Sequence, residues 1–370
     1  MVKILCIIDG LEAGGAETFL MKILRCLPYP QYGFDFVVSA AGGCYEAEVL
    51  ARGGKIHVVP KRTQDVFGAV SGIYSAVKNN KYEYVLKLGS RSVAVLDLFV
   101  AKCAGAKRVA IRSCNAPTEL STKDKVLHRI LRPLLNVISD VKIAPSMIAA
   151  EFTFGKHYAR TKTNLLNNGV DLSVYHYDLE GAMAIRREFG LQNKLLVGHV
   201  GRFHKQKNHK YLLEVFSEIK KLRQDAVLML VGIGELENQV RLQSEELGLE
   251  SSVIFAGRRF DIPQLLSAMD VFVFPSLHEG MPNTVIEAQA TGLPCIIADT
   301  ITTEANITGL VQYLPLTLSA EAWAKAALSV IDLPRKDTSE DFLAQGYDIE
   351  SVTKKFISLL EIDDEHIIKT

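Results

Sequence analysis

Short apolar runs alternate with longer stretches of helical periodicity along most of this 370-residue chain, and this alternation constrains the fold more than any other feature. Apolar runs of about four to eight residues between turn formers are typical of buried strands. In the first part of the chain we predict strands at Ile4–Ile8, Phe34–Ser39, Ile56–Val59, Tyr84–Leu88, Arg108–Ile111 and Val141–Ala144. Helical stretches separate most of these strands and begin near Ala16, Tyr45, Val66, Val93 and Thr122.

A second series of the same kind follows. Its predicted strands are Leu195–Val200, Ala226–Val231, Val253–Phe255, Val271–Phe274 and Cys295–Ala298. Its predicted helices begin near Asn208, Glu235, Ile262 and Asn283. Three further helices are predicted at Ala320–Ile331, Asp337–Gln345 and Ile349–Glu361. Strands that alternate with helices in this way indicate βαβ units and parallel sheets.

Between the two series, the segment Asn164–Ser173 is rich in turn-forming residues, and we predict a linker there. The expected fold is therefore α/β, with two Rossmann-like, doubly wound parallel-sheet domains that face a central cleft. In such sheets, ligands bind outside the carboxyl ends of the strands. Residues that directly follow predicted strands are accordingly the first candidates for function.

The six cysteines are scattered, and none forms a Cys-x-x-Cys pair. This distribution argues against a zinc site and against a disulfide framework, and it predicts a reducing compartment. The apolar run near the N-terminus is too short for a signal sequence, and no apolar stretch approaches the roughly 18 residues that suggest a membrane span. We therefore expect a cytoplasmic protein that has no cysteine-bound zinc site and no membrane-spanning helix.

The charges are balanced overall but unevenly distributed. Lys and Arg number 42, as do Asp and Glu, and this balance disfavours a nucleic-acid partner. Residues 1–170 hold 23 basic and 13 acidic side chains, whereas residues 171–370 hold 19 and 29. The basic first part therefore suits an anionic partner, and the acidic second part needs local cations wherever it binds an anion.

A glycine pair follows the first predicted strand. Gly14 and Gly15 precede Ala16 and Glu17 at the expected start of a helix. Two glycines allow the backbone to approach a ligand closely, and a helix N-terminus attracts anions. The segment is not the G-x-G-x-x-G dinucleotide fingerprint, and the alternative is a turn that only connects strand to helix.

Two cations lie just after the first strand of the second series. Gly201 and Arg202 follow Leu195–Val200, and Lys207 lies at the expected start of the next helix, where Asn208 is a candidate cap. Arg engages phosphate oxygens with two parallel hydrogen bonds, and Lys acts as a point charge. The pair therefore suits a diphosphate, the alternative being a solvated basic loop.

A pair of carboxylates brackets the start of another predicted helix. Glu279 precedes it in a loop, and Glu287 lies one to two turns into it among apolar neighbours. Pro282 suits the first helical turn, and the free N–H groups near Asn283 and Thr284 could receive a phosphate. Because a carboxylate accepts two hydroxyl hydrogen bonds, a sugar or ribose diol is a good partner. The alternative gives Glu279 a capping role and leaves Glu287 on the surface.

The segment Thr122–Asn136 is basic and amphipathic. Lys125, Arg129 and Arg132 recur at helical spacing beside Leu127, Ile130, Leu131 and Leu134. Such a helix can lie on an anionic membrane, which predicts peripheral association at the inner face of the plasma membrane. The alternative is an ordinary surface helix whose apolar stripe packs into the core.

Together these motifs resemble the retaining GT-B glycosyltransferases of family 4. The glycine pair, the strand-end cations, Leu-Val-Gly-x-Gly-Glu at Leu230–Glu235 and the Glu-x7-Glu segment all match, and Asp270–Asp299 is the most specific part. The resemblance covers essentially the whole chain. It is closest to bacterial exopolysaccharide and capsule transferases, at Gly42–Glu48 and Ile297–Thr308.

The resemblance implies a division of labour along the chain. Residues 1–168 would form an acceptor-binding domain and residues 169–348 a nucleotide-sugar-binding domain, with a C-terminal helix at 349–370 crossing back to the first. Arg202 and Lys207 would hold the donor diphosphate and Glu279 the donor sugar, and these three would carry catalysis. Residues implied in donor binding are Gly14, Gly15, Gly201, Arg258, Arg259, Gly280, Met281, Pro282, Asn283, Thr284 and Glu287.

One loop departs from the family pattern. In similar exopolysaccharide transferases, the strand that corresponds to Arg108–Ile111 leads into a His-Ser-His-Asn type loop, and a histidine there approaches the donor sugar. This chain has Arg112-Ser113-Cys114-Asn115 instead. Arg112, Cys114 and Asn115 are therefore acceptor-side candidates that could replace the missing histidines.

The function implied by the resemblance is retaining transfer of a sugar from a nucleotide-diphosphate sugar to a saccharide in polysaccharide biosynthesis. We expect a UDP-sugar donor, a lipid-linked acceptor and no metal or other cofactor. Leaving-group stabilisation by the cations and by the helix start near Asn283 would supply most of the catalysis. Two alternatives stay open: a GT-B epimerase or phosphorylase, and a non-catalytic nucleotide-sugar-binding subunit.

Overall fold

A computed structural model describes residues 2–12, 14–114 and 121–362, which form two compact units. The first unit comprises Met1–Gly169 and Gly346–Thr370, and the second comprises Val170–Gln345. The unit boundaries lie close to the domain boundaries expected at residues 168 and 348. The acceptor and donor roles assigned to the two domains stay predictions.

The first unit contains a seven-stranded sheet in the order β3-β2-β1-β4-β5-β6-β7. All of its strand pairs are parallel. The strands are β1 (Val2–Ile7), β2 (Tyr32–Val38), β3 (Ile56–Val58), β4 (Tyr84–Leu88), β5 (Arg108–Arg112), β6 (Val141–Ala144) and β7 (Asn164–Leu165). The strand order turns back on itself between β1 and β4, which makes this the switch point where ligands bind in doubly wound sheets.

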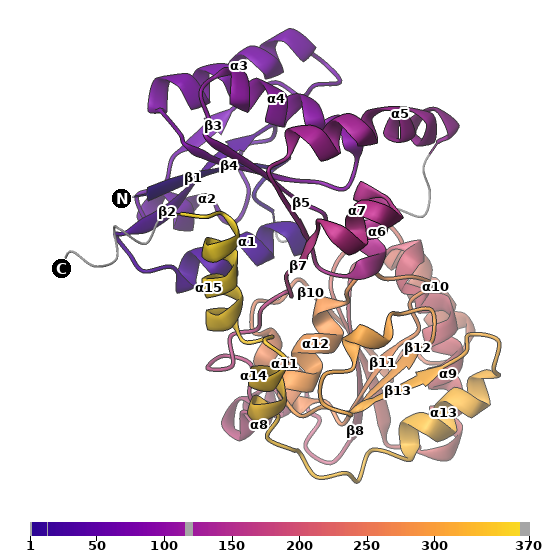
Figure 1. The fold of residues 1–370 in the computed structure, drawn as a ribbon. Helices are drawn as coiled ribbons and strands as arrows, with labels where there is room; N and C mark the ends of the chain where they lie inside the picture. The colour runs from indigo at the N-terminus through magenta and orange to yellow at the C-terminus, as the bar shows by residue number, and fades with distance from the viewer. Residues whose placement is uncertain (1, 13, 115–120, 363–370) are drawn as a thin grey trace. The chain divides into compact units, whose positions relative to one another are not determined.

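Helices cover both faces of this sheet (Figure 1). They are α1 (Gly15–Cys26), α2 (Glu46–Ala51), α3 (Val66–Asn80), the 3-10 turn η1 (Ser92–Ala94), α4 (Val95–Cys103), α5 (Thr122–Ile138), α6 (Met147–Phe154), α7 (Lys156–Thr161) and α15 (Ile349–Leu359). Along β1, Ile4 and Cys6 enter one hydrophobic cluster, whereas Leu5 and Ile7 enter the other. Because successive side chains of a strand point to opposite faces, the apolar run of β1 supplies a core on each side.

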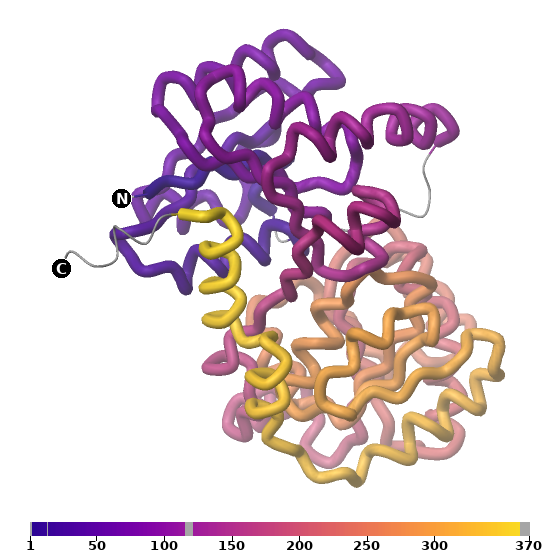
Figure 2. Tube along the Cα trace, in the orientation of Figure 1, coloured from indigo at the N-terminus to yellow at the C-terminus, as the bar shows by residue number. Residues whose placement is uncertain are grey.

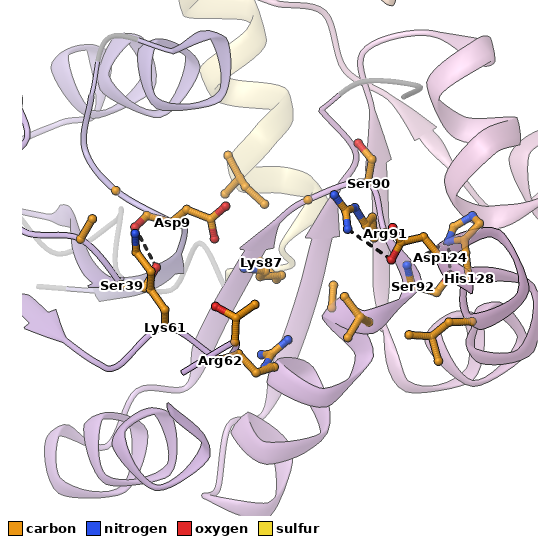
Figure 3. Close-up of a pocket in the computed structure, with 18 of the residues that line it drawn as sticks. Asp9, Ser39, Lys61, Arg62, Lys87, Ser90, Arg91, Ser92, Asp124 and His128 are labelled. Atoms are coloured by element: carbon orange, nitrogen blue, oxygen red, sulfur yellow. Dashed lines mark hydrogen bonds and ion pairs between the residues drawn. The ribbon is translucent and has the colours of Figure 1, made fainter. Parts of the chain in front are cut away.

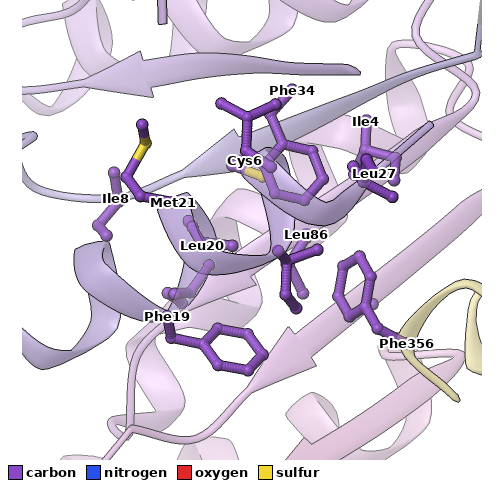
Figure 4. Close-up of a cluster of buried hydrophobic side chains, with 14 of the residues drawn as sticks. Ile4, Cys6, Ile8, Phe19, Leu20, Met21, Leu27, Phe34, Leu86 and Phe356 are labelled. Carbon is purple, nitrogen blue, oxygen red and sulfur yellow. The ribbon is translucent and has the colours of Figure 1, made fainter. Parts of the chain in front are cut away.

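The C-terminal helix α15 is part of the first unit and packs against α1, and Figure 2 traces the chain as it returns. Phe356 of α15 makes edge contacts with the rings of Phe19 and Phe34, at centroid distances of 6.5 and 6.0 Å. Figure 4 shows Phe356 facing the cluster that contains Phe19 and Leu86. Burial of these rings fixes α15 to the sheet.

The second unit contains a six-stranded parallel sheet in the order β10-β9-β8-β11-β12-β13. The strands are β8 (Leu195–Val200), β9 (Ala226–Val231), β10 (Val253–Gly257), β11 (Val271–Phe274), β12 (Cys295–Ala298) and β13 (Val311–Leu314). The helices and 3-10 turns are α8 (Leu179–Glu188), η2 (Lys205–Lys207), α9 (His209–Leu222), α10 (Glu237–Glu246), α11 (Ile262–Ala268), α12 (Asn283–Ala290), η3 (Thr303–Ala305), α13 (Ala320–Leu328) and α14 (Ser339–Ala344). Its switch point lies between β8 and β11, which are adjacent.

The boundary between the two units, at Gly169 and Val170, lies within the segment Asn164–Ser173 that we predicted as a linker, but the first two residues of that segment form a strand. Asn164–Leu165 forms the edge strand β7, which pairs with β6, and Leu166 and Val170 are buried. The sequence does not predict this strand, because it has only two residues and lies among turn-forming side chains. Its formation depends on pairing with the neighbouring strand β6. Among the residues described, no helix has the length and apolarity that crossing a membrane requires.

Candidate functional site

In the second unit, hydrogen bonds join the loops that follow β8 and β11. The Leu277 N–H donates to the Gln206 carbonyl, and the Gln206 side-chain amide donates back to the His278 carbonyl, both at 2.8 Å. Asn208 Nδ2 donates to the Pro275 carbonyl at 3.2 Å. Asn208 is the N-cap residue of α9, as predicted, but its side chain makes this cross-loop bond in place of a capping hydrogen bond. The two loops thus form one platform at the switch point of the sheet.

An ion pair links the same two loops. Lys207 Nζ lies 2.7 Å from Glu279 Oε1, and the Ser276 hydroxyl donates to that oxygen at 2.7 Å. Lys207 Nζ also lies 4.5 Å from the centroid of the Phe274 ring. The side chains of Lys207 and Glu279 are only 17% and 9% exposed. Burial strengthens the attraction between the two charges, and removal of either partner would leave the other charge buried without it.

Arg202 lies at the end of β8 and differs from Lys207 in its surroundings. Its side chain is exposed and forms no hydrogen bond or ion pair with the part of the chain that the structure describes. Gly201, which precedes it, is closely surrounded by side chains: a Cβ there would lie 3.0 Å from His199 Nε2 and 3.2 Å from Lys207 Cε. The side chains of His199 and Lys207 therefore account for this glycine, and the Arg202 guanidinium is available to an anionic ligand.

Two buried histidines lie beneath the cationic loop, and the sequence patterns did not single them out. The rings of His199 and His209 are 4.9 Å apart, and His209 stacks on Phe203 at 4.5 Å. Burial, with a smaller contribution from Lys207, lowers the pKa of His209 to about 4. Burial also holds the pKa of His199 well below its usual range. Both rings are therefore neutral near pH 7, and they add no charge under Lys207.

Helix α12 begins directly after the Glu279 loop. Pro282 is its N-cap residue, one position earlier than the predicted first helical turn, and the N–H groups of Val285 and Ile286 both donate to the Pro282 carbonyl. The N–H groups of Asn283 and Thr284 precede these bonds at the positive end of the helix dipole. Gly280 and Met281 are buried in the loop.

Glu287 lies within α12, and its side chain is 7% exposed. The alternative that placed Glu287 on the helix surface is therefore wrong. A carboxylate this buried is expensive to desolvate, so its position implies polar partners, in the protein or in a ligand.

The two arginines implied in donor binding, Arg258 and Arg259, differ in their surroundings. Arg259 forms ion pairs with Glu188 and Asp261, with nitrogen–oxygen distances of 2.7 and 2.6 Å, and these bonds raise its pKa. The Arg259 guanidinium thus links the end of α8 to the start of α11, and this structural role accounts for an arginine at this position. Arg258 is exposed beside it. Across the described residues, no three His, Cys, Asp or Glu side chains gather to hold a metal.

The first unit has its own pocket, of about 880 Å³, at the switch point of its sheet. It is lined by residues that follow β1, β2, β3 and β4, together with part of α5 (Figure 3). Asp9 and Glu17 contribute carboxylates, and burial raises the pKa of Glu17, with weaker contributions from Asp9 and Glu12. A Cβ on Gly14, the N-cap of α1, would collide with the Glu17 carboxylate. Gly14 thus leaves room for Glu17 at the pocket, and Gly15 begins the helix.

Cations line the other part of this pocket. Arg62 and Lys87 both pair with the buried carboxylate of Asp97, and Arg91 lies 3.6 Å from Asp124. Lys61 is exposed at the pocket. The pocket therefore combines carboxylates suited to sugar hydroxyls with cations suited to phosphate.

Among the acceptor-side candidates at the end of β5, Arg112 differs from expectation. Arg112 is 2% exposed, donates to Asn168 and stacks on Phe19 with its guanidinium carbon 3.6 Å from the ring centroid. Burial lowers the pKa of Arg112 to about 10. Arg112 is thus a buried packing residue and does not reach out to a ligand. Cys114 is half-buried, burial raises its pKa, and Asn115 lies outside the described residues.

Known proteins similar to this chain include two curated relatives. The chain is 31% identical over 376 residues to the "Putative glycosyltransferase EpsF" of Bacillus subtilis (strain 168). The match covers 98% of this chain and 97% of that protein. It is 28% identical over 300 residues to the UDP-Gal:alpha-D-GlcNAc-diphosphoundecaprenol alpha-1,3-galactosyltransferase of Escherichia coli. That match covers 77% of this chain and 76% of the relative.

The fold also has solved counterparts. The crystal structure of Anabaena Alr3699/HepE in complex with UDP-glucose matches with a TM-score of 0.80 at 20% identity, and covers 97% of this chain and 99% of that one. This likeness shows the GT-B fold. The sequence profile of the family described as "Glycosyl transferases group 1" matches residues 183–349. With the match to EpsF over nearly the full length of both chains, these findings show that the chain belongs to the group 1 glycosyltransferases, family 4 of the GT-B fold.

Proposed function

We propose that the chain transfers a sugar from a UDP-sugar to a hydroxyl of a lipid-linked saccharide, with retention of the anomeric configuration. Two names support the choice of donor and acceptor. The Escherichia coli relative is named for a UDP-galactose donor and a diphosphoundecaprenol-linked acceptor, and the Anabaena structure is titled as a complex with UDP-glucose. A role in polysaccharide biosynthesis follows from such an acceptor.

The observation that carries this proposal is the joined platform at the β8–β11 switch point. There the Lys207–Glu279 pair and Arg202 come from two loops that hydrogen bonds hold together. In the proposed complex, Arg202 and Lys207 hold the donor diphosphate, and the α12 N-terminus receives its β-phosphate. Glu279 binds the donor sugar, and the buried Glu287 binds the ribose diol.

The chemistry is a displacement at the anomeric carbon of the donor sugar. The bond from that carbon to the β-phosphate oxygen breaks, and a bond to the acceptor hydroxyl oxygen forms on the same face. The acceptor proton passes to the leaving β-phosphate. Negative charge grows on this phosphate in the transition state, and the fixed cations stabilise it without having to reorganise. This mechanism needs no metal, because Arg202 and Lys207 supply the positive charge.

The pocket of the first unit is the proposed acceptor site. Its carboxylates at Asp9 and Glu17 would accept hydroxyl hydrogen bonds from the saccharide. Lys61 and Arg91 would meet the phosphate that links the saccharide to its lipid. Arg112 is not part of this proposal, because it is buried against Phe19. Cys114 and Asn115 stay acceptor-side predictions.

A two-step experiment tests the proposal. First, a panel of nucleotide sugars is screened for binding by calorimetry, and the best ligand is then offered with synthetic saccharide-diphosphate-lipid acceptors. The proposal expects UDP-sugar binding and a new α-linked disaccharide on the lipid. Conversion of the donor without any acceptor, or a requirement for inorganic phosphate, would favour an epimerase or phosphorylase. Tight donor binding with no transfer would favour a non-catalytic subunit.

A further inference from the structure

The central strand β4 of the first unit carries a lysine among apolar neighbours. Lys87 lies between Leu86 and Leu88, and its side chain is only 13% exposed. Because side chains alternate along a strand, Lys87 is on the same face as Val85, which belongs to a hydrophobic cluster. A cation is expensive to bury in such surroundings unless it gains charged partners. The position of Lys87 therefore implies an anionic partner, in the protein or in a ligand.

Two cations share one buried carboxylate at this position. The Asp97 side chain, on α4, is 3% exposed, and its two oxygens have different partners. Oδ1 pairs with Arg62, and Oδ2 lies 3.4 Å from Lys87 Nζ. Arg62 belongs to the loop after β3, so the three charges join three elements of the unit. We call these three residues the Asp97 triad, and its two cations exceed its single carboxylate by one positive charge.

The surplus charge of the Asp97 triad faces the pocket of the first unit. Arg62 and Lys87 both line this pocket, whereas the buried Asp97 is outside the described lining. In the view of Figure 3, the labelled side chains of Arg62 and Lys87 lie between Asp9 and Arg91. Arg62 Nε forms no hydrogen bond with the described part of the chain. The triad therefore gives the pocket a positive wall, and Arg62 keeps an unused donor.

The carboxylates that line the pocket do not pair with these two cations. Among the described residues, neither Arg62 nor Lys87 forms an ion pair with a carboxylate other than Asp97. Glu17 lies in a negative environment instead: burial raises its pKa, and the charge of Asp9 adds to this effect. A surplus cation that is partly buried is most stable when an anion reaches it. The surplus charge of the triad is therefore available to an anionic group of a ligand.

We propose that the Asp97 triad selects an acceptor saccharide that carries a carboxylate, as a uronic acid does. A sugar carboxylate brings a single negative charge, which matches the surplus of the triad. A phosphate monoester would bring about −1.5 to −2 charges at pH 7, close to the carboxylates of Asp9 and Glu17. Arg62 and Lys87 donate to the sugar carboxylate while Asp97 holds both side chains in place.

Exposure separates the triad from the cations proposed to contact the lipid phosphate. The Arg62 and Lys87 side chains are 26% and 13% exposed, whereas that of Arg91 is 57% exposed. The triad thus lies deeper in the pocket wall, where the saccharide itself would lie rather than its linkage to the lipid. This assignment rests on the proposed function, which places the acceptor saccharide in this pocket.

The test compares saccharides that differ only in one carboxylate group. Octyl β-D-glucuronide and octyl β-D-glucoside form the first pair, and the same two sugars on a diphosphate-linked lipid form the second. Dissociation constants for the protein without donor are measured by calorimetry, and KM and kcat are measured by sugar transfer. In both pairs, the wild type should bind the glucuronide about tenfold or more tightly than the glucoside, because the glucuronide forms charge-assisted hydrogen bonds.

Variants of the triad should lose this preference. Lys87→Met and Arg62→Met should each bring the two affinities to within about threefold, mainly by weakening the glucuronide. Each variant leaves Asp97 with one cation, so the fold should persist, which thermal unfolding checks. Arg62→Lys keeps the charge and should retain part of the preference. Lys107→Met removes an exposed lysine that pairs with Glu83, and this matched control should bind all four ligands like the wild type.

Equal affinity of the wild type for the two octyl glycosides, or no measurable binding of either, would overturn the proposal. Equal losses for both sugars in Lys87→Met would leave the triad a purely structural ion cluster. Binding of the diphosphate-linked pair with no difference between its two sugars would assign the surplus charge to the phosphate of the lipid linkage. Absence of transfer from every UDP-sugar, with the preference for the glucuronide intact, refutes the proposed function alone.

Discussion

Removal of the Lys207 charge tests two contributions of this residue: one to the stability of the fold and one to catalysis. In Lys207→Met, Glu279 loses its partner and keeps only the Ser276 hydroxyl at 2.7 Å. Breaking a fully buried pair destabilises a protein by about 3–5 kcal/mol, and because Lys207 is 17% exposed we expect a loss near or below the lower limit. If Lys207 also stabilises the leaving phosphate, turnover should fall about 10²–10³-fold, which corresponds to about 2.7–4 kcal/mol of transition-state stabilisation.

The double variant Lys207→Met/Glu279→Gln distinguishes the two contributions. Neutralising Glu279 removes the uncompensated charge, so the free energy of unfolding measured in urea should recover most of the loss. Turnover, followed as UDP release, should stay low because the cation beside the phosphate is still absent and Glu279 no longer offers a carboxylate to the donor sugar. Lys325→Met, which breaks an exposed pair with Glu321, is the matched control and should change neither quantity. Recovery of turnover in the double variant to within about threefold of wild type would refute the catalytic role of Lys207.

Two further predictions concern stability. The pKa of His209 is lowered from 6.5 to about 4. Between these two values, the unfolded chain binds a proton at this residue that the folded chain does not bind. The free energy of unfolding should therefore decrease as the pH is lowered, and His209 should account for about 2 kcal/mol of the decrease between pH 7 and pH 5. In His209→Phe, the free energy of unfolding measured in urea should depend less on pH. An unchanged pH dependence would contradict the lowered pKa of His209. Phe356→Ala should destabilise the first unit by about 3–5 kcal/mol, because it removes the ring that α15 packs against Phe19 and Phe34, and a loss under about 1 kcal/mol would show that α15 is not anchored there.

The central strands were predictable because they are buried on both faces. The apolar run Val271–Phe274 is fully buried in β11, and its predicted bounds match the structure. By contrast, β13 at Val311–Leu314 lies on the sheet edge with Gln312 exposed, and its alternating polarity gave no comparable signal. The short helix α7 escaped prediction for a related reason: with one buried residue, Ala159, it shows no apolar stripe.

The sequence predicts those residues of the candidate site that lie in loops directly after predicted strands. Lys207 and Glu279 are 72 positions apart in sequence, yet their strands are neighbours, so a parallel sheet brings their loops together. The Ser276 bond and the burial of His199 depend on side-chain packing that no local pattern encodes. The same limit applies to Arg112, whose stacking on Phe19 comes from a different element of the chain. For α5, the amphipathic sequence predicts an apolar stripe, but it does not predict which face of the helix packs against the rest of the first unit.

The most direct test of the account is the turnover of Arg202→Ala. Arg202 is exposed and has no partner among the described residues, so its removal should leave the thermal unfolding temperature unchanged. The measurement is the rate of sugar transfer at saturating donor, with Lys210→Ala as the matched loss of an exposed cation from the start of α9. If Arg202 stabilises the departing diphosphate, its variant should be about 10²–10³-fold slower while the Lys210 variant keeps the wild-type rate. An Arg202→Ala rate within about threefold of wild type would contradict the proposed donor site.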